Sequence, residues 1–134
     1  MQSERKPTDE AAIRDLVENW AHAVRTKNVA EILANHSPDI LMFDVPPPLH
    51  CKGIEDYKQT WDRFFSGGQS EVFDVIEMDV TAGNDVAFVT ALMRCGGTEP
   101  NGERTELEFR LTVGLRKIAG QWTVMHEHHS VPAT

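Results

Sequence analysis

The stretch Gly120-Gln121-Trp122-Thr123-Val124-Met125-His126-Glu127-His128-His129-Ser130-Val131-Pro132 decides the fold, because it predicts the closing strand of a β-sheet. A glycine turn opens this strand, and a proline, which cannot donate to a strand ladder, ends it. Successive side chains of a regular strand point to opposite faces. One face is therefore expected to carry Trp122, Val124, His126, His128 and Ser130, and the other face Thr123, Met125, Glu127 and His129. Three histidines within four residues, beside large apolar groups, indicate a strand that lines a cavity or an interface.

Three helices are expected before the long strands. Apolar residues at spacings of three and four predict the first helix, which begins near Thr8. Asn28, with Glu31 three residues later, predicts the capping box of a short second helix. A third helix is expected to start near Gly53 and to end at Ser66-Gly67-Gly68.

The strands are predicted by alternation of apolar and polar residues. A short strand is expected over residues 40–45, followed by an extended connection through three prolines, and longer strands over 72–81, 86–94 and 107–115. Helices followed by hairpin-linked strands predict an α+β fold, in which three N-terminal helices pack on a curved, mostly antiparallel β-sheet. A cone of this kind encloses a cavity, which is the default binding site.

Composition narrows the classes of partner. The chain has 134 residues, 40% of them hydrophobic, and a formal net charge of −8. This length predicts one domain over residues 8–134 after a flexible tail of residues 1–7. The negative charge argues against binding to nucleic acid or to an anionic membrane. No apolar run approaches a transmembrane helix or a signal peptide, so a cytoplasmic location is expected.

The two cysteines, Cys51 and Cys95, show no metal-binding or redox spacing. They are expected to be free, semi-buried thiols in a reducing compartment.

The order of these elements, the segment Phe43-Asp44-Val45-Pro46 and the closing stretch from Gly120 to Pro132 resemble the NTF2-like superfamily. Within it, the chain is most similar to the SnoaL-like and ketosteroid-isomerase-homologue proteins of the DUF4440 type. The closing stretch also resembles the end of the association domain of calcium/calmodulin-dependent kinase. The resemblance covers about Ile13 to Pro132 and implies a conical fold. It leaves activity open, since the superfamily includes isomerases, dehydratases, polyketide cyclases and assembly modules.

The resemblance to the isomerases implies roles for individual residues. Asp44 falls where that family has its catalytic Asp, and Trp20, 24 positions before it, falls where the family has its oxyanion-binding Tyr. Near Thr112 the sequence has no counterpart of the family's protonated Asp. Because an indole N–H is a weaker acid than a phenol, rapid steroid isomerisation is not expected.

Asp44, His126 and His128 are the candidate catalytic residues. Asp44 is expected to be a general base in a dry cavity, with a structural cap of the proline turn as the alternative. His126 and His128 are expected to donate hydrogen bonds in the pocket. They could instead chelate zinc or iron, with a third ligand from Asp44, His22, His36 or His50. The resemblance implies chemistry without a metal or another cofactor.

Four further residues are candidates for substrate binding. Trp20, Tyr57 and Trp61 are expected to form the core and the cavity wall. Arg110 could clamp a carboxylate ligand or pair with a neighbouring glutamate across the strands.

Two functions remain open at this point. One is a cofactor-free isomerase, cyclase or dehydratase that binds a small apolar or aromatic molecule. The other is a non-catalytic ligand-binding or oligomerisation module. A homodimer through the β-sheet is expected in either case, with Glu127 and His129 exposed or at its interface.

Overall fold

The computed structural model describes residues 8–68 and 70–133. The expected tail, residues 1–7, lies outside this part of the chain. The elements follow in the order α1 (Asp9–Arg25), α2 (Val29–Leu33), β1 (His36–Phe43), β2 (Cys51–Lys52), α3 (Ile54–Ser66), β3 (Val72–Ala82), β4 (Val86–Thr98), β5 (Arg104–Ile118) and β6 (Gln121–Ser130). The predicted α+β class is confirmed.

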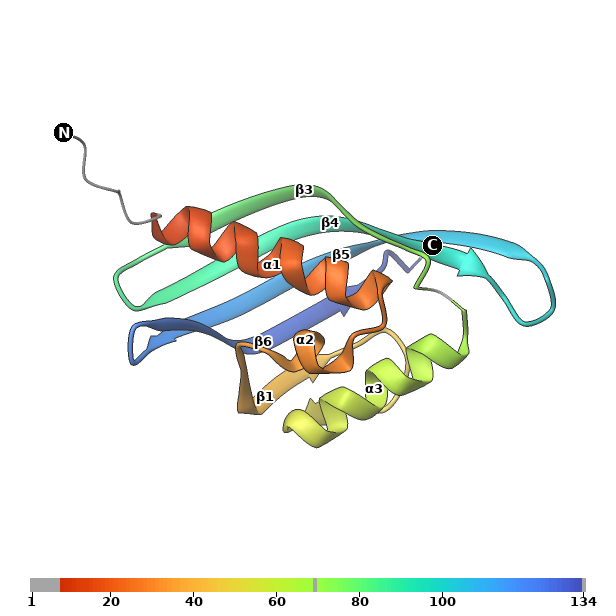
Figure 1. Cartoon of the computed structure of the whole chain (residues 1–134), viewed down its shortest axis with the longest axis horizontal. Coiled ribbons are helices and arrows are strands. Elements are labelled where there is room, and N and C mark those ends of the chain that lie inside the picture. The colour runs from red at the N-terminus through yellow and green to blue at the C-terminus, as the bar shows by residue number, and fades with distance from the viewer. Residues whose placement is uncertain (1–7, 69, 134) are drawn as a thin grey trace.

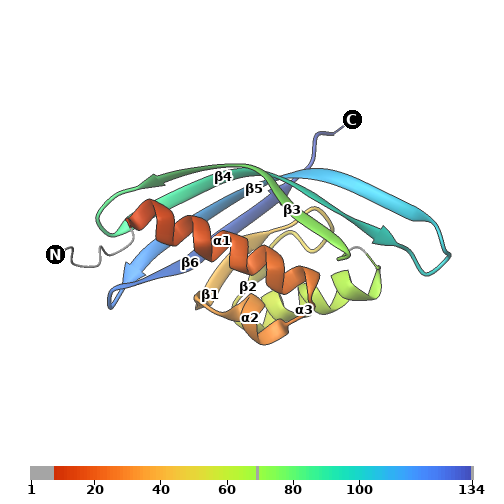
Figure 2. The same ribbon diagram turned by 45° about the horizontal axis from the view of Figure 1, so that its top comes forward.

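The strands of the described residues form a single six-stranded sheet in the order β2-β1-β6-β5-β4-β3. Every neighbouring pair is antiparallel except β1 and β6. Figure 1 shows α1 running along the sheet, with α2 and α3 beside β1, and the turned view in Figure 2 shows the sheet arching over the three helices, which lie on the same side of it. The predicted curved, mostly antiparallel sheet with helices on one face is therefore confirmed.

Helix α1 packs along the sheet through an apolar stripe. Ile13, Val17 and Trp20 are buried on this stripe at the predicted spacing. The side chain of Thr8 accepts a hydrogen bond of 3.1 Å from the backbone N–H of Ala11, so the helix begins at a satisfied cap. The predicted start of the helix is confirmed.

The two shorter helices also begin and end near the predicted residues. The side chain of Asn28 caps α2 by accepting a hydrogen bond of 3.2 Å from the Glu31 backbone N–H. Helix α3 buries Tyr57 and Trp61 and ends at Gly67. Through these two buried aromatic residues, α3 packs against the concave side of the sheet.

Strand β6 carries a β-bulge that changes the expected faces. Val124 pairs with Leu115 and His126 pairs with Gly114, so Met125 is an extra residue between the two pairs. An extra residue reverses the side-chain alternation that follows it.

The inward face of β6 therefore consists of Trp122, Val124, Glu127 and His129, all of which are buried. The prediction that His126 and His128 share a face with Trp122 is wrong, and so is the prediction that Glu127 and His129 point outwards. The cause is the bulge, because the expected alternation assumed a regular strand.

None of the described helices has both the length and the apolar character needed to cross a membrane.

Candidate functional site

A pocket of about 540 Å³ opens between α3, the connection from β1 to β2, and the concave side of β3–β6. Its wall is mostly apolar and includes four aromatic rings, and its size is typical of small-molecule sites. The lining residues are Met42, Asp44, Val45, Pro46, Pro47, Pro48, Cys51, Thr60, Trp61, Arg63, Phe64, Phe73, Cys95, Leu107, Phe109 and His129.

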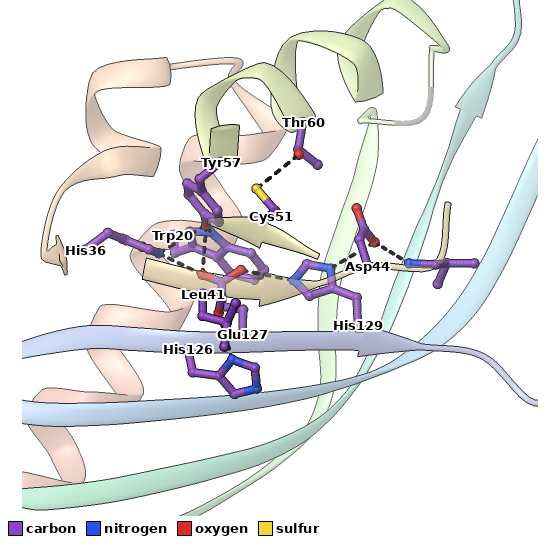
Figure 3. A network of polar contacts seen from close by, with 11 residues as sticks. Trp20, His36, Leu41, Asp44, Cys51, Tyr57, Thr60, His126, Glu127 and His129 are labelled. Carbon is purple, nitrogen blue, oxygen red and sulfur yellow. Dashed lines mark hydrogen bonds and ion pairs between the residues drawn. The ribbon is translucent and has the colours of Figure 1, made fainter. Parts of the chain in front are cut away.

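Asp44 and His129 bring two titratable groups together in this wall. Asp44 follows the end of β1, and its side chain is 22% exposed. One carboxylate oxygen, Oδ1, accepts a hydrogen bond of 2.8 Å from the backbone N–H of Val45. The same oxygen lies 4.0 Å from Nδ1 of His129, which is too far for a direct hydrogen bond (Figure 3). A ligand atom that lies beside these two atoms, on the pocket side, could contact both.

His129 is held in a fixed orientation by its other nitrogen and by its ring. Nε2 donates a hydrogen bond of 3.0 Å to Oε1 of Glu127. The ring stacks on Phe109, with centroids 5.6 Å apart and planes 16° apart. In its neutral form, with the proton on Nε2, His129 presents the lone pair of Nδ1 to Asp44 and the pocket.

Glu127 is the acceptor that fixes His129. It is only 2% exposed, and its Oε2 accepts hydrogen bonds from His36 Nε2 (2.7 Å) and from the Tyr57 hydroxyl (2.8 Å). Burial alone would raise the pKa of this carboxyl. The hydrogen bonds from His129 and His36, and then the charge of His36, outweigh burial and hold the pKa of Glu127 well below its ordinary value. The carboxylate is therefore ionised deep in the core.

His36 supplies the positive charge that balances Glu127. Its Nδ1 lies 2.8 Å from the carbonyl oxygen of Ala34, and its Nε2 faces the Glu127 carboxylate. Both partners can only accept, so both ring nitrogens donate and His36 is an imidazolium. The pair thus meets the requirement that buried charges be matched.

Tyr57 and Trp20 complete this buried network behind the pocket. The indole N–H of Trp20 donates a hydrogen bond of 2.9 Å to the Tyr57 hydroxyl, which itself donates to Glu127. Burial, and then the charge of Glu127, raise the pKa of Tyr57 well above its ordinary value. The phenol stays neutral and acts as a donor. Trp20 and Tyr57 are therefore core residues, and Trp20 touches His129 edge-on at 6.1 Å between ring centroids.

The structure brings only part of the predicted site together. Asp44 and Trp61 line the pocket. Arg110 is exposed on the outer face of the sheet, where its Nε donates a hydrogen bond of 3.1 Å to Ser130 Oγ. Arg110 is not among the pocket-lining residues, so it does not provide the carboxylate clamp that was predicted for it. Cross-strand pairing with a glutamate falls instead to Arg94, which bonds Glu108 at 3.1 Å.

His126 and His128 also lie on the outer face, so the pocket role predicted for them has no geometric basis. Nδ1 of His126 lies 2.7 Å from the carbonyl oxygen of Leu41, and Figure 3 shows the His126 ring on the opposite side of β6 from His129. Both rings pack edge-on against Phe43 instead.

Sequence reasoning did not assign Glu127 and His129 to the pocket side, and it named His36 only as a possible metal ligand. The signal for Glu127 and His129 was present, since they alternate in the same way as His126 and His128. Their order, an acid two residues before a base, is the pattern that lets one side chain orient the other on a single face. His36 had no such signal, because it meets Glu127 across 91 positions of sequence.

The two cysteines are free and buried, and both line the pocket. Burial raises the pKa of the Cys51 thiol, and it raises the pKa of Cys95 to about 11. Both stay protonated near neutral pH and are poor nucleophiles, because the reactive form is the thiolate.

No group of three His, Cys, Asp or Glu side chains within residues 8–68 and 70–133 is arranged to hold a metal ion. The alternative of a metal bound by His126 and His128 with Asp44 does not match their positions, since the two histidines lie on the face opposite the pocket.

The chain matches the family model described as "SnoaL-like domain" over residues 13–134. A solved NTF2-like protein of unknown function from Pseudomonas putida KT2440 is 35% identical, with a TM-score of 0.80 over 95% of this chain and 90% of that one. The association domain of C. elegans CaMKII is 20% identical, with a TM-score of 0.72 over 89% and 92% of the two chains. An NTF2-like superfamily protein from Salmonella enterica is 15% identical, with a TM-score of 0.78 over 91% and 89%. No curated protein matches the chain significantly.

Proposed function

The chain belongs to the SnoaL-like family of NTF2-like proteins, and we propose that it binds a small, largely apolar molecule in its pocket and transfers a proton on that molecule. His129 and the Asp44 carboxylate are the two groups that carry the proton in this proposal. The observation that carries it is the 4.0 Å gap between His129 Nδ1 and Asp44 Oδ1 in a mostly apolar wall.

The chemistry follows from the two sides of His129. Nδ1, without a proton, accepts one from a C–H or O–H group of the bound molecule. The imidazolium that forms keeps its Nε2–H on the Glu127 carboxylate, which stabilises the new charge as the aspartate of a catalytic triad does. Return of the proton to a different atom, directly from Nδ1 or after relay through the Asp44 carboxylate, completes an isomerisation, a cyclisation or the loss of water.

The oxyanion hole of the steroid isomerases is not reproduced in this arrangement. The Trp20 indole N–H donates to Tyr57, and the Tyr57 hydroxyl donates to Glu127, so neither donor faces the pocket. The donor nearest to an enolate formed beside His129 is the new Nδ1–H itself. We therefore propose proton transfer on a substrate whose own structure modestly stabilises the anion that forms when the proton is removed.

Deuterium exchange tests the proposal without a known substrate. The probe is 2-tetralone, an apolar aromatic ketone with acidic C–H groups, incubated in D₂O and followed by mass spectrometry. Wild type is expected to accelerate exchange, and Asp44→Asn and His129→Asn are expected to slow it by about 100-fold or more, as for loss of a general base. The amide oxygen introduced by Asp44→Asn can still accept the hydrogen bond from the Val45 N–H, so this variant is expected to keep the wild-type melting temperature.

His128→Asn is the matched control, since it removes an imidazole from the outer face of the same strand. Full exchange activity is expected for this variant. An active His129→Asn protein, or an equal loss in His128→Asn, would remove His129 from the mechanism.

Assembly is a second candidate function, and it rests on the outer face of β4. Val86, Phe88 and Leu92 are large apolar side chains that remain exposed on this face, and Phe88 is 51% exposed. A row of exposed apolar groups along one strand is typical of an interaction surface. We infer that a second copy of the chain covers it in a homodimer formed through the β-sheet.

A further inference from the structure

We propose that the ligand carries an anionic group, of the carboxylate class, which pairs with Arg63, and a flat apolar body held between Arg63 and His129. This inference rests on the proposed function and names the class of molecule that the same pocket takes.

Arg63 is the only cationic side chain among the described residues that line the pocket. It lies on α3 one turn after Thr60 and next to Phe64, both of which also line the wall. No carboxylate of the described residues forms an ion pair with its guanidinium, whereas Arg14, Arg25, Arg94 and Arg104 all have acidic partners. The guanidinium therefore keeps its donors for another partner, and its fork suits a carboxylate.

The charge of Arg63 acts on the pocket interior. Burial raises the pKa of the Cys51 thiol, and the positive charge of Arg63 opposes this increase, while the carboxylates of Asp56 and Asp44 add to it. Cys51 lies on the pocket wall, so the positive charge of Arg63 reaches the pocket interior, where it offsets part of the effect of Asp56 and Asp44.

Asp44 fixes which way an anionic ligand lies. A carboxylate beside Asp44 would meet a like charge, and the whole chain carries a net charge of −8. Arg63 is thus the place on the wall where an anion is favoured. The ligand's acid group is directed to α3, and the other end of the ligand is directed to Asp44 and His129.

The distance along α3 sets the size of the apolar body. Tyr57, whose hydroxyl belongs to the network behind His129, and Arg63 are six residues apart, or about 9 Å along a helix axis. Trp61, Phe64 and Phe109 line the pocket together with Arg63. One or two fused rings fit this span and these walls.

Isothermal titration calorimetry with a matched pair of probes tests the inference. The probes are 2-naphthoate and its uncharged analogue 2-naphthamide, at low ionic strength. Wild type is expected to bind the acid about tenfold more tightly than the amide, a difference of about 1.4 kcal/mol. Arg63→Gln is expected to abolish this preference by weakening only the acid, and Arg63→Lys is expected to retain part of it.

Arg116→Gln is the matched control, because it changes the net charge equally at an exposed position of β5 outside the pocket lining. It is expected to keep the preference. Equal affinity of wild type for acid and amide, or an equal loss of preference in Arg116→Gln, overturns the Arg63 subsite and leaves the proposed function standing. Failure of both probes to bind, together with no exchange of 2-tetralone, overturns the pocket function as well.

Discussion

Glu127 keeps its charge inside the core because donors face both of its oxygens. Its role is to fix the His129 ring, while His36 supplies the opposite charge. Removing one partner of such a buried pair leaves an uncompensated charge. The residue therefore connects the stability of the protein to the orientation of the candidate base.

The first prediction concerns the pH dependence that this carboxylate gives to stability. Its pKa falls from an ordinary value of 4.5 to about 2 in the folded chain, so the unfolded chain binds the proton first as the pH is lowered. The stabilisation from Glu127 is complete above pH 4.5 and is lost as the pH falls towards about 2. Urea unfolding followed by tryptophan fluorescence at a series of pH values measures this loss.

Glu127→Gln supplies the comparison for that measurement. It is expected to lower the free energy of unfolding at pH 7 by about 3–5 kcal/mol, the typical result of breaking a buried pair. The gap between wild type and variant is expected to narrow as the pH falls below 4.5. Two curves that stay parallel down to the lowest measurable pH would show that the carboxyl is not ionised in the fold.

At the scale of elements, β4 approaches the connection between α3 and β3 closely at one end of the pocket. A Cβ added at Gly97 would meet the backbone carbonyl of Gly68, whereas one added at Gly114 would be in ordinary contact with His126. Gly97→Ala is expected to lower the free energy of unfolding by about 1–3 kcal/mol, as overpacking does, and Gly114→Ala by much less. Thermal unfolding of the two variants checks this, and equal melting temperatures would contradict the close approach.

Much of the element pattern could be predicted from the sequence because local signals specify it. Helix caps at Thr8 and Asn28 and the alternation along β4 and β5 depend on neighbours a few residues away. The bulge at Met125 has no such local signal, because it depends on how β6 pairs with both β5 and β1. One extra residue was enough to exchange the pair His126 and His128 with the pair Glu127 and His129 between the faces.

The candidate site was predictable to a smaller extent. Asp44 was identified because the resemblance to a known family marks its position after a short strand. His36 and Glu127 are brought together only by the parallel pairing of β1 with β6, for which the chain offers no local signal. The sequence does not show that Arg63 faces the pocket, because only the packing of α3 decides which side of this helix lines it.

At the scale of the whole molecule, the proposed homodimer depends on the outer face of the sheet. Wild type is expected to elute with twice the chain mass of 15.1 kDa in size-exclusion chromatography with light scattering. Phe88→Lys, which places a charge among exposed apolar groups, is expected to give the monomer. Leu49→Lys changes an exposed apolar residue in the connection between β1 and β2, away from that face, and is expected to remain dimeric. A monomeric wild type would exclude the homodimer.

The central claim is that His129, oriented by Glu127, presents a proton-free Nδ1 to the pocket. Imidazole ¹⁵N NMR of uniformly labelled protein at pH 7 measures this directly, with His129→Asn and His128→Asn spectra to assign the signals. The account predicts one fixed tautomer for His129, with its proton on Nε2, and two protonated nitrogens for His36. In Glu127→Gln the preference of His129 for that tautomer is expected to weaken. A His129 ring protonated on Nδ1, or one that averages between the two tautomers, would contradict this assignment.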